Sequence, residues 1–323
     1  MFERFPNQWT PVMPLAELTT NPVSIELAGE ALVLFKDNDG DWHALKDQCP
    51  HRGAKLSLGV VNKEGFLRCG YHGWRFDGEG ACKGTPLNDL NAAALGKIQA
   101  TALPTLEVGG ALWVYTATDP ASDDVPEPQL PDSLAGDPTH FVTYKQEWQT
   151  HWSRAQENFI DFAHPPYLHE QTIGAWMHDF AEGGGVARVD AERTDFGMIM
   201  TSYVGSNTNG FKLHWCKPNL AILHFGWTAY NWLHVFCIPV NETQTRVMTV
   251  RRMPSEDDAH SYSRSASGTD HRILDEDRVI VESQQGDVLS DPDEISVATD
   301  KPTLVFRDWY RDLLGTSGAQ IDE

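Results

Sequence analysis

The 323-residue sequence lacks long apolar runs, and no stretch approaches the roughly 20 apolar residues of a membrane-spanning helix. Its first nine residues also lack the basic start and following apolar segment of a secretory signal. A hydrophobic content of 41% is ordinary for a globular chain, and the length suffices for two domains. We therefore expect a cytoplasmic protein of two packed domains with no membrane partner.

Basic residues are scarce: 25 Lys and Arg stand against 46 Asp and Glu, which gives a formal net charge of −21. Such a charge argues against nucleic acid or an anionic membrane surface as a partner. Acidic stretches such as residues 122–128 and 255–258 are expected to be solvated loops.

Cysteine is also scarce, with five in the chain. Two of them lie near histidines, and the odd remainder of Cys82, Cys216 and Cys237 is scattered, which does not suggest a disulfide framework. We expect these three to be small buried side chains.

Two short clusters each supply one thiolate and one imidazole: Cys49-Pro50-His51-Arg52-Gly53 and Cys69-Gly70-Tyr71-His72-Gly73-Trp74. Four such ligands suit two loops that close over one inorganic centre. A structural zinc ion is an alternative, because two Cys and two His also satisfy tetrahedral zinc. Zinc motifs usually pair Cys with Cys and His with His, however, whereas a two-iron cluster can take one of each per loop. The spacing favours the cluster and leaves zinc open.

These clusters, with the following Gly78 and Gly80, closely resemble the Rieske [2Fe-2S] signature. The resemblance implies that Cys49 and Cys69 hold the buried iron, while His51 and His72 hold the iron nearer the surface. Neutral imidazoles raise the reduction potential, so such a centre accepts and passes single electrons.

Around these clusters, short stretches rich in strand-forming residues alternate between apolar and polar side chains, at residues 23–27, 31–35, 42–45 and 111–116. We therefore expect an all-β domain over residues 1–118, with the ligand loops between strands. The following segment is rich in Pro and Asp, so residues 119–136 are expected to form a linker.

Residues 137–323 show a mixed pattern. Strand-like stretches occur at residues 139–147, 197–203, 220–227, 232–239 and 245–252, and helical patterns occur at residues 152–163, 271–285 and 303–314. The order predicts an antiparallel sheet flanked by helices, and the whole chain is expected to be α+β.

A second constellation contains His164 and His169, five residues apart, with Asp161 three residues before the first. Pro165 disfavours the helical conformation at His164, and Pro166 adds a second break, so both imidazoles can converge by leaving the helical path. The plainer interpretation is a solvated polar face followed by a turn.

Two histidines need a third ligand, and the segment from Ile273 offers five acids: Asp275, Glu276, Asp277, Glu282 and Asp287. On a helical wheel Asp277 lies in the middle of the apolar face of Ile273, Leu274, Ile280 and Val281. A buried carboxylate is costly unless it is paired or binds a cation. An Arg partner is one explanation. Two His and one carboxylate are also the facial triad of non-haem Fe(II) oxygen chemistry.

The chain as a whole resembles the α subunit of a Rieske non-haem iron oxygenase, over nearly its full length. The resemblance implies that His164, His169 and Asp277 bind a mononuclear Fe(II) and that Asp161 bridges to the cluster. Asn158 matches a position near the open side of the iron. The chain is more similar to the compact α-only monooxygenases and demethylases than to the larger ring dihydroxylases.

This resemblance implies that O2 and electrons are used to hydroxylate or oxidatively demethylate a small, largely apolar organic substrate. The sequence has no Gly-x-Gly-x-x-Gly after a strand, so a separate NAD(P)H reductase, with or without a ferredoxin, is expected as donor. A head-to-tail homotrimer is implied, in which one subunit's cluster meets the next subunit's iron.

Two rival functions remain: an electron carrier or redox sensor with only a Rieske cluster, and an aromatic ring dihydroxylase. Five aromatic residues are candidates for an apolar pocket, although aromatics in strands more often belong to the core: Trp176, Phe211, Phe225, Trp227 and Trp232.

Overall fold

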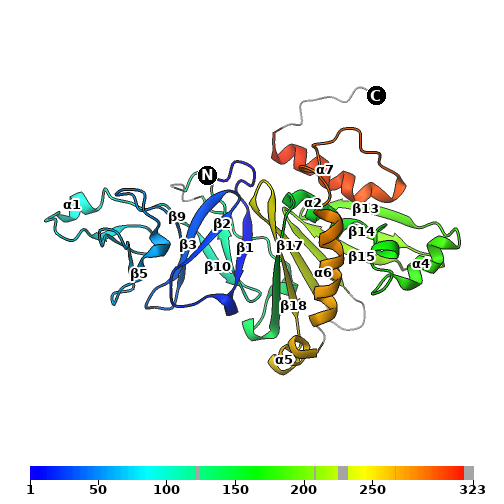
Figure 1. Ribbon diagram of the computed structural model, residues 1–323, viewed down its shortest axis with the longest axis horizontal. Coiled ribbons are helices and arrows are strands. Elements are labelled where there is room, and N and C mark those ends of the chain that lie inside the picture. Colours follow the sequence, from blue (N-terminus) through cyan, green and yellow to red (C-terminus); the bar gives the residue numbers. More distant parts are fainter. Residues whose placement is uncertain (121–123, 207–208, 225–231, 266, 316–323) are drawn as a thin grey trace. The chain divides into compact units, whose positions relative to one another are not determined.

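The structure is a computed structural model that describes residues 1–120, 124–206, 209–224, 232–265 and 267–315. Its residues form two compact units, Met1–Pro128 and Gln129–Glu323. The division follows Pro128, which lies within residues 119–136; the domain bounds expected from composition stay a prediction. The expected α+β class, with an all-β unit followed by a sheet and helices, is confirmed (Figure 1).

The first unit contains three small antiparallel sheets, in the strand orders β1-β11-β10, β2-β3-β4-β9 and β5-β6-β7-β8. The elements are β1 (Trp9–Pro14), β2 (Val23–Leu27), β3 (Glu30–Lys36), β4 (Trp42–Lys46), β5 (Val60–Val61), β6 (Leu67–Arg68), β7 (Arg75–Phe76), β8 (Cys82–Gly84), α1 (Ala92–Leu95), β9 (Ala102–Leu103), β10 (Thr105–Val108) and β11 (Ala111–Tyr115).

The apolar core of this unit reaches the ligand loops. Val33, Phe35 and Leu45 of the second sheet belong to one buried cluster with Cys49 and Cys69. Both cysteines are therefore anchored by the packing of the sheet beside them, which limits their movement.

The second unit is built on a seven-stranded antiparallel sheet in the order β12-β18-β17-β16-β15-β14-β13. The strands are β12 (Phe141–Trp148), β13 (Arg188–Thr194), β14 (Gly197–Tyr203), β15 (Phe211–Cys216), β16 (Leu220–His224), β17 (Trp232–Asn241) and β18 (Gln244–Arg252). The helices are α2 (Trp152–Ile160), α3 (Pro165–Leu168), α4 (Ala175–Glu182), α5 (Glu256–Ser265), α6 (Ser267–Val281) and α7 (Lys301–Leu313).

Helices α2 and α7 pack against opposite parts of this sheet. Helix α2 contacts β16, β17 and β18, and α7 contacts β13 and β14, while α2 also contacts α6 and α7 (Figure 1). None of the helices among the described residues is both long and apolar enough to cross a membrane.

The structure corrects one feature of the helical wheel. Ile280 is 51% exposed, so it does not belong to the buried stripe of α6; Leu274, Asp277 and Val281 form that stripe at i, i+3 and i+7. The helix also begins at Ser267, four residues before the expected start, and ends at Val281.

Candidate functional site

The two cluster loops, residues 49–54 and 69–74, share one backbone geometry. In the first loop the Cys49 amide donates to Ala54, and the Gly53 amide donates to Cys49. In the second loop, Cys69 donates to Trp74 and Gly73 donates to Cys69. Gly53 and Gly73 both have φ of 71°, a conformation that favours glycine. Each Cys-to-Gly spacing is therefore a turn that presents one thiol and one imidazole.

The four side chains of these loops converge. The His51 and His72 rings lie 4.5 Å apart between centroids, and His51 stacks on Trp74 at 4.3 Å. Both thiols are 2% exposed, whereas His72 is exposed at the surface. Two buried thiols and two neighbouring imidazoles, one of them exposed, make up the donor set of a Rieske cluster.

The protonation chemistry of the loops also fits a metal cluster. Burial, together with the neighbouring Cys69, raises the pKa of the Cys49 thiol to about 11, so a bound cation is needed to hold its thiolate. Desolvation, with smaller effects of His72 and Arg52, lowers the pKa of His51 and favours the neutral ring that binds metal. His51 Nδ1 is buried and has no hydrogen-bond partner within the described part of the chain.

Helix α2 ends at Ile160, and the chain leaves the helical path at Asp161. Pro165 predicts this break at His164, three residues later. Asp161 is extended at φ −84° and ψ 143°, while His164 is helical and caps α3. Pro165 occupies the first turn of α3, where its missing N–H costs nothing. His164 is thus helical although Pro165 disfavours that conformation, and the expectation that the chain leaves the helical path there is wrong; the two imidazoles do converge.

His164, His169 and Asp277, which we term the triad, place one ligand atom each within 4.8 Å of one another. Asp277 Oδ1 lies 3.1 Å from His169 Nε2 and 3.6 Å from His164 Nε2. Asp277 and His169 are each 2% exposed. Despite these distances, Asp277 Oδ1 has no hydrogen bond with good geometry among the described residues. A cation between the three atoms satisfies this buried oxygen, so the triad fits a metal ion.

A carboxylate contacts the Nδ1 atom of each imidazole and orients the ring. Asp161 Oδ2 lies 2.9 Å from His164 Nδ1, and Glu276 Oε2 lies 2.9 Å from His169 Nδ1. An imidazole that donates from Nδ1 presents the lone pair of Nε2, which is the atom that faces Asp277. Asp161 also accepts a hydrogen bond from the His164 amide, and Glu276 accepts one from Thr172.

These contacts shift the pKa values of the site. Burial lowers the pKa of His169, but the neighbouring carboxylates of Asp277 and Glu276 outweigh burial and raise it. Burial alone raises the pKa of Asp161, but its contacts with His164 lower that pKa overall. In the same way, His169 and Thr172 lower the pKa of Glu276 against the effect of burial. Both supporting carboxylates therefore stay ionised at neutral pH.

The other acids of the α6 segment lie elsewhere. Asp275 accepts from Gln146, Glu282 accepts from the Gln149 amide, and Asp287 accepts from Ser290. Of the five candidate acids in this segment, the structure thus places Asp277 at the triad and Glu276 against His169 Nδ1. From the sequence, Glu276 is only one of five possible ligands, and its position directly before Asp277 gives no signal of contact with His169.

A cavity of about 470 Å³ adjoins the triad, between α6 and the sheet. Its volume lies within the range of small-molecule sites. Of the candidate aromatics, Phe211 lines this cavity and Trp176 and Trp232 do not, while Phe225 and Trp227 fall outside the described residues. Asn158 also lines it, and its buried Nδ2 lacks a hydrogen-bond partner within the structure described.

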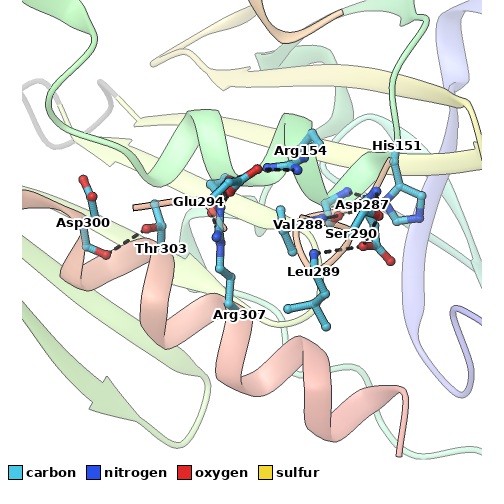
Figure 2. Close-up of polar contacts among 12 residues, drawn as sticks. His151, Arg154, Asp287, Val288, Leu289, Ser290, Glu294, Asp300, Thr303 and Arg307 are labelled. Carbon is cyan, nitrogen blue, oxygen red and sulfur yellow. Dashed lines mark hydrogen bonds and ion pairs between the residues drawn. The ribbon is translucent and has the colours of Figure 1, made fainter. Parts of the chain in front are cut away.

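A network of charged side chains holds α2, which carries Asn158 and leads to Asp161. Figure 2 shows Arg154 and Arg307 directed at Glu294, at 2.7 and 2.6 Å. Arg307 of α7 also contacts Glu157 of α2 at 2.6 Å. Because Arg154 is only 3% exposed, this network fixes α2 against α7 and the segment before it.

Comparison with known families covers most of the chain. Residues 8–99 match the Rieske [2Fe-2S] domain, and residues 148–315 match the vanillate O-demethylase oxygenase C-terminal domain. The chain is 30% identical over 325 residues to the methylxanthine N3-demethylase NdmB of Pseudomonas putida, which covers 94% of this chain and 88% of that protein.

Two further comparisons bear on length and fold. The chain is 28% identical to the chloroplastic chlorophyllide a oxygenase of Chlamydomonas reinhardtii, covering 94% of this chain but about half, 47%, of that relative. The solved structure of NdmA with caffeine, from Pseudomonas putida CBB5, superposes with a TM-score of 0.75 at 25% identity, covering 98% of this chain and 93% of that one.

Proposed function

The chain belongs to the Rieske non-haem iron oxygenases, and from that premise we propose that it hydroxylates or oxidatively demethylates a small, largely apolar organic substrate. O2 is the oxidant in this proposal, and a separate NAD(P)H-dependent reductase supplies electrons directly or through a ferredoxin. The observation that carries it is the buried Asp277 Oδ1, which has two imidazole nitrogens beside it and a cavity next to it.

The proposed metal ligands fall into two sets. Cys49, His51, Cys69 and His72 hold the [2Fe-2S] cluster, and His164, His169 and Asp277 hold a mononuclear Fe(II). When bound, the cluster supplies single electrons and the Fe(II) supplies a site for O2 activation.

The surrounding residues bind and orient. Asp161 and Glu276 fix the ring orientation of His164 and His169, so that both Nε2 atoms face one point. The Asn158 amide group can donate a hydrogen bond from Nδ2 into the cavity. The apolar side chains of the cavity exclude water from the substrate.

The relatives support demethylation as the class of reaction. One matched domain is named for vanillate O-demethylase, and NdmB is named a methylxanthine N3-demethylase. Hydroxylation of a methyl group on oxygen or nitrogen releases formaldehyde. Ring dihydroxylation is the alternative within the family.

Assembly as a head-to-tail homotrimer is part of the proposal. Both hydrogen bonds that Asp161 accepts from His164 end on Oδ2, and the Asp161 side chain is 20% exposed. Oδ1 can therefore accept a hydrogen bond from His72 of a second copy. Such a contact places one subunit's cluster next to the following subunit's iron.

The test is substrate-dependent O2 consumption by the purified protein with NADH and a reductase. Methoxyarenes, N-methyl compounds and sterols form the panel, and formaldehyde is measured with O2. We expect at least one compound to stimulate O2 uptake with formation of hydroxylated product or formaldehyde. An electron carrier without oxygenase activity gives cluster reduction and no product with any compound, and a cis-diol product indicates a dihydroxylase.

A further inference from the structure

The floor of the cavity is a row of side chains that crosses the sheet. Met200, Leu213, Leu223, Leu233 and Arg251 pair in register on five neighbouring strands, and all five line the cavity. Directly paired residues of antiparallel strands share a face. The row is therefore four apolar side chains that end in one arginine.

Arg251 is paired at this end of the row. Its Nη2 and Nε lie 2.9 and 3.2 Å from Asp270 Oδ2, and the Tyr262 hydroxyl also donates to Asp270 Oδ2. Burial, with Asp270 as a smaller cause, raises the pKa of Tyr262, so this hydroxyl remains a donor. Arg251 is 8% exposed, and Asp270 lines the same cavity. All contacts of Asp270 within the described residues end on Oδ2, which leaves Oδ1 as an acceptor.

Helix α6 sets the distance of this pair from the triad. Asp270 and Asp277 are seven residues apart, which is nearly two full turns, so they share one helix face about 10 Å apart along the axis. Ile273 and Leu274 line the cavity between them. A substrate with its oxidised carbon near the triad therefore reaches the pair with its far end, across an apolar segment.

The charge of the pair selects the chemistry of that far end. Arg251 and Asp270 neutralise each other, and together they offer guanidinium donors and a carboxylate acceptor. A substrate carboxylate has to lie beside the Asp270 charge, and like charges at a buried site weaken binding strongly. Lys212 also lines the cavity, but it is exposed, so its charge is solvated. A neutral group that both accepts and donates matches the pair without adding charge.

We propose that the Arg251–Asp270 pair is a specificity element that binds a neutral carboxamide or lactam group of the substrate and disfavours a carboxylate. This inference rests on the oxygenase function proposed above, since it places the oxidised carbon at the triad. It assigns the substrate class: an apolar molecule with a methyl group at one end and a neutral amide-like group at the other.

The test compares two probes of the same shape, 4-methoxybenzamide and 4-methoxybenzoate, by calorimetric titration of the protein with its metal centres intact. We expect the parent to bind the amide more tightly by on the order of 10- to 100-fold. Asp270→Asn removes the carboxylate charge beside Arg251 and with it the repulsion of a substrate carboxylate, so the preference should reverse toward the benzoate. Tyr262→Phe keeps both charges and should keep the preference for the amide.

Asp308→Asn is the matched control, because Asp308 pairs with Arg193 at the surface and does not line the cavity. Equal or tighter binding of the benzoate by the parent, or an unchanged ratio in Asp270→Asn, overturns the proposal. The titration contains no reductant, so it reports binding independently of turnover. If the amide-to-benzoate ratio shifts as expected but no compound is turned over when the reductase and NADH are added, the oxygenase function is wrong and the recognition role stands.

Discussion

The cluster loops and the triad differ in what holds their side chains in place. In the cluster loops, backbone hydrogen bonds within six residues of each other set the turns that carry the ligands. In the triad, His164 and His169 flank α3 and Asp277 lies on α6, more than 100 residues further along the chain, and Asp161 and Glu276 hold the two histidines by side-chain contacts. A short-range motif therefore specifies the first site, and the packing of the second unit specifies the other.

The largest expected effect is on the cluster loops themselves. His72→Ala removes a proposed cluster ligand, so the red-brown absorbance and all turnover should disappear. Absorbance and iron content of the purified variant measure this. Cys82→Ser is the control, because Cys82 is a buried thiol outside the loops, and the colour of this variant should persist. A colourless parent with one zinc per chain would contradict the cluster.

Asp277→Ala tests the triad without touching the loops. The variant should lose turnover by about 1,000-fold or more, since a ligand is lost and a metal site of three protein ligands rarely survives with two. Asp275→Ala, two residues away on the same helix, should keep turnover within about twofold, as expected for a surface substitution. Steady-state O2 uptake measures both. Normal turnover in Asp277→Ala means that the wheel argument chose the wrong carboxylate.

Asp161→Asn tests the link between the two kinds of site. The amide keeps the size of the side chain but weakens its hydrogen bonds to His164 and, in the proposed trimer, to His72 of a second copy. Both metal centres should therefore persist, while electron transfer between them falls by about 10-fold or more. Single-turnover reoxidation of the reduced cluster with substrate and O2 measures the rate. Reoxidation as fast as in the parent, or an active monomer by light scattering, would rule out the bridging role.

Glu276→Gln has a smaller expected effect, because it orients one ligand and binds no metal itself. The variant should bind Fe(II) about 10- to 100-fold more weakly, as for other residues behind a metal ligand. Titration of the iron-depleted protein with Fe(II) measures the affinity. Glu282, directly after the end of α6, accepts from the Gln149 amide instead, so the Fe(II) affinity of Glu282→Gln should match the parent.

The smallest expected effect comes from the network that holds α2. Arg307→Met leaves Glu157 and Glu294 with Arg154 as their remaining partner, so the free energy of unfolding should fall by about 1–3 kcal/mol with the cluster absorbance unchanged. Thermal unfolding measures the loss. Arg193→Met removes a surface pair and should change the free energy of unfolding by no more than about 0.5 kcal/mol. An equal loss of stability in Arg307→Met and Arg193→Met would show that the network stabilises the fold no more than a surface ion pair does.

The difference between the two sites also explains what the sequence predicts. The cluster loops could be recognised residue by residue, because their spacing encodes the turns. For the triad, the period of α6 identified Asp277, yet it misplaced Ile280 and the ends of the helix. Propensity alone located the end of α2 three residues too late, since Asp161 breaks the helix through its contacts with His164.

Other features were missed. Strand β13 has two apolar residues, Val189 and Ala191, so its signal is weak, whereas the alternation of Phe211, Leu213 and Trp215 in β15 is a strand signal that was overlooked. The pairing of Arg251 with Asp270 joins β18 to α6, and the support of His169 by Glu276 joins α3 to α6. Both depend on how the helices lie over the sheet, which no single segment encodes.

The central claim is that the triad, and no other group, holds a mononuclear iron beside an intact cluster. The direct measurement is iron per chain in the parent and in Asp277→Ala, determined together with the visible spectrum after reconstitution. Two irons in the cluster and one in the triad predict about three per chain in the parent and about two in the variant, with the same spectrum. About three in both proteins, or about two in both, would contradict the claim.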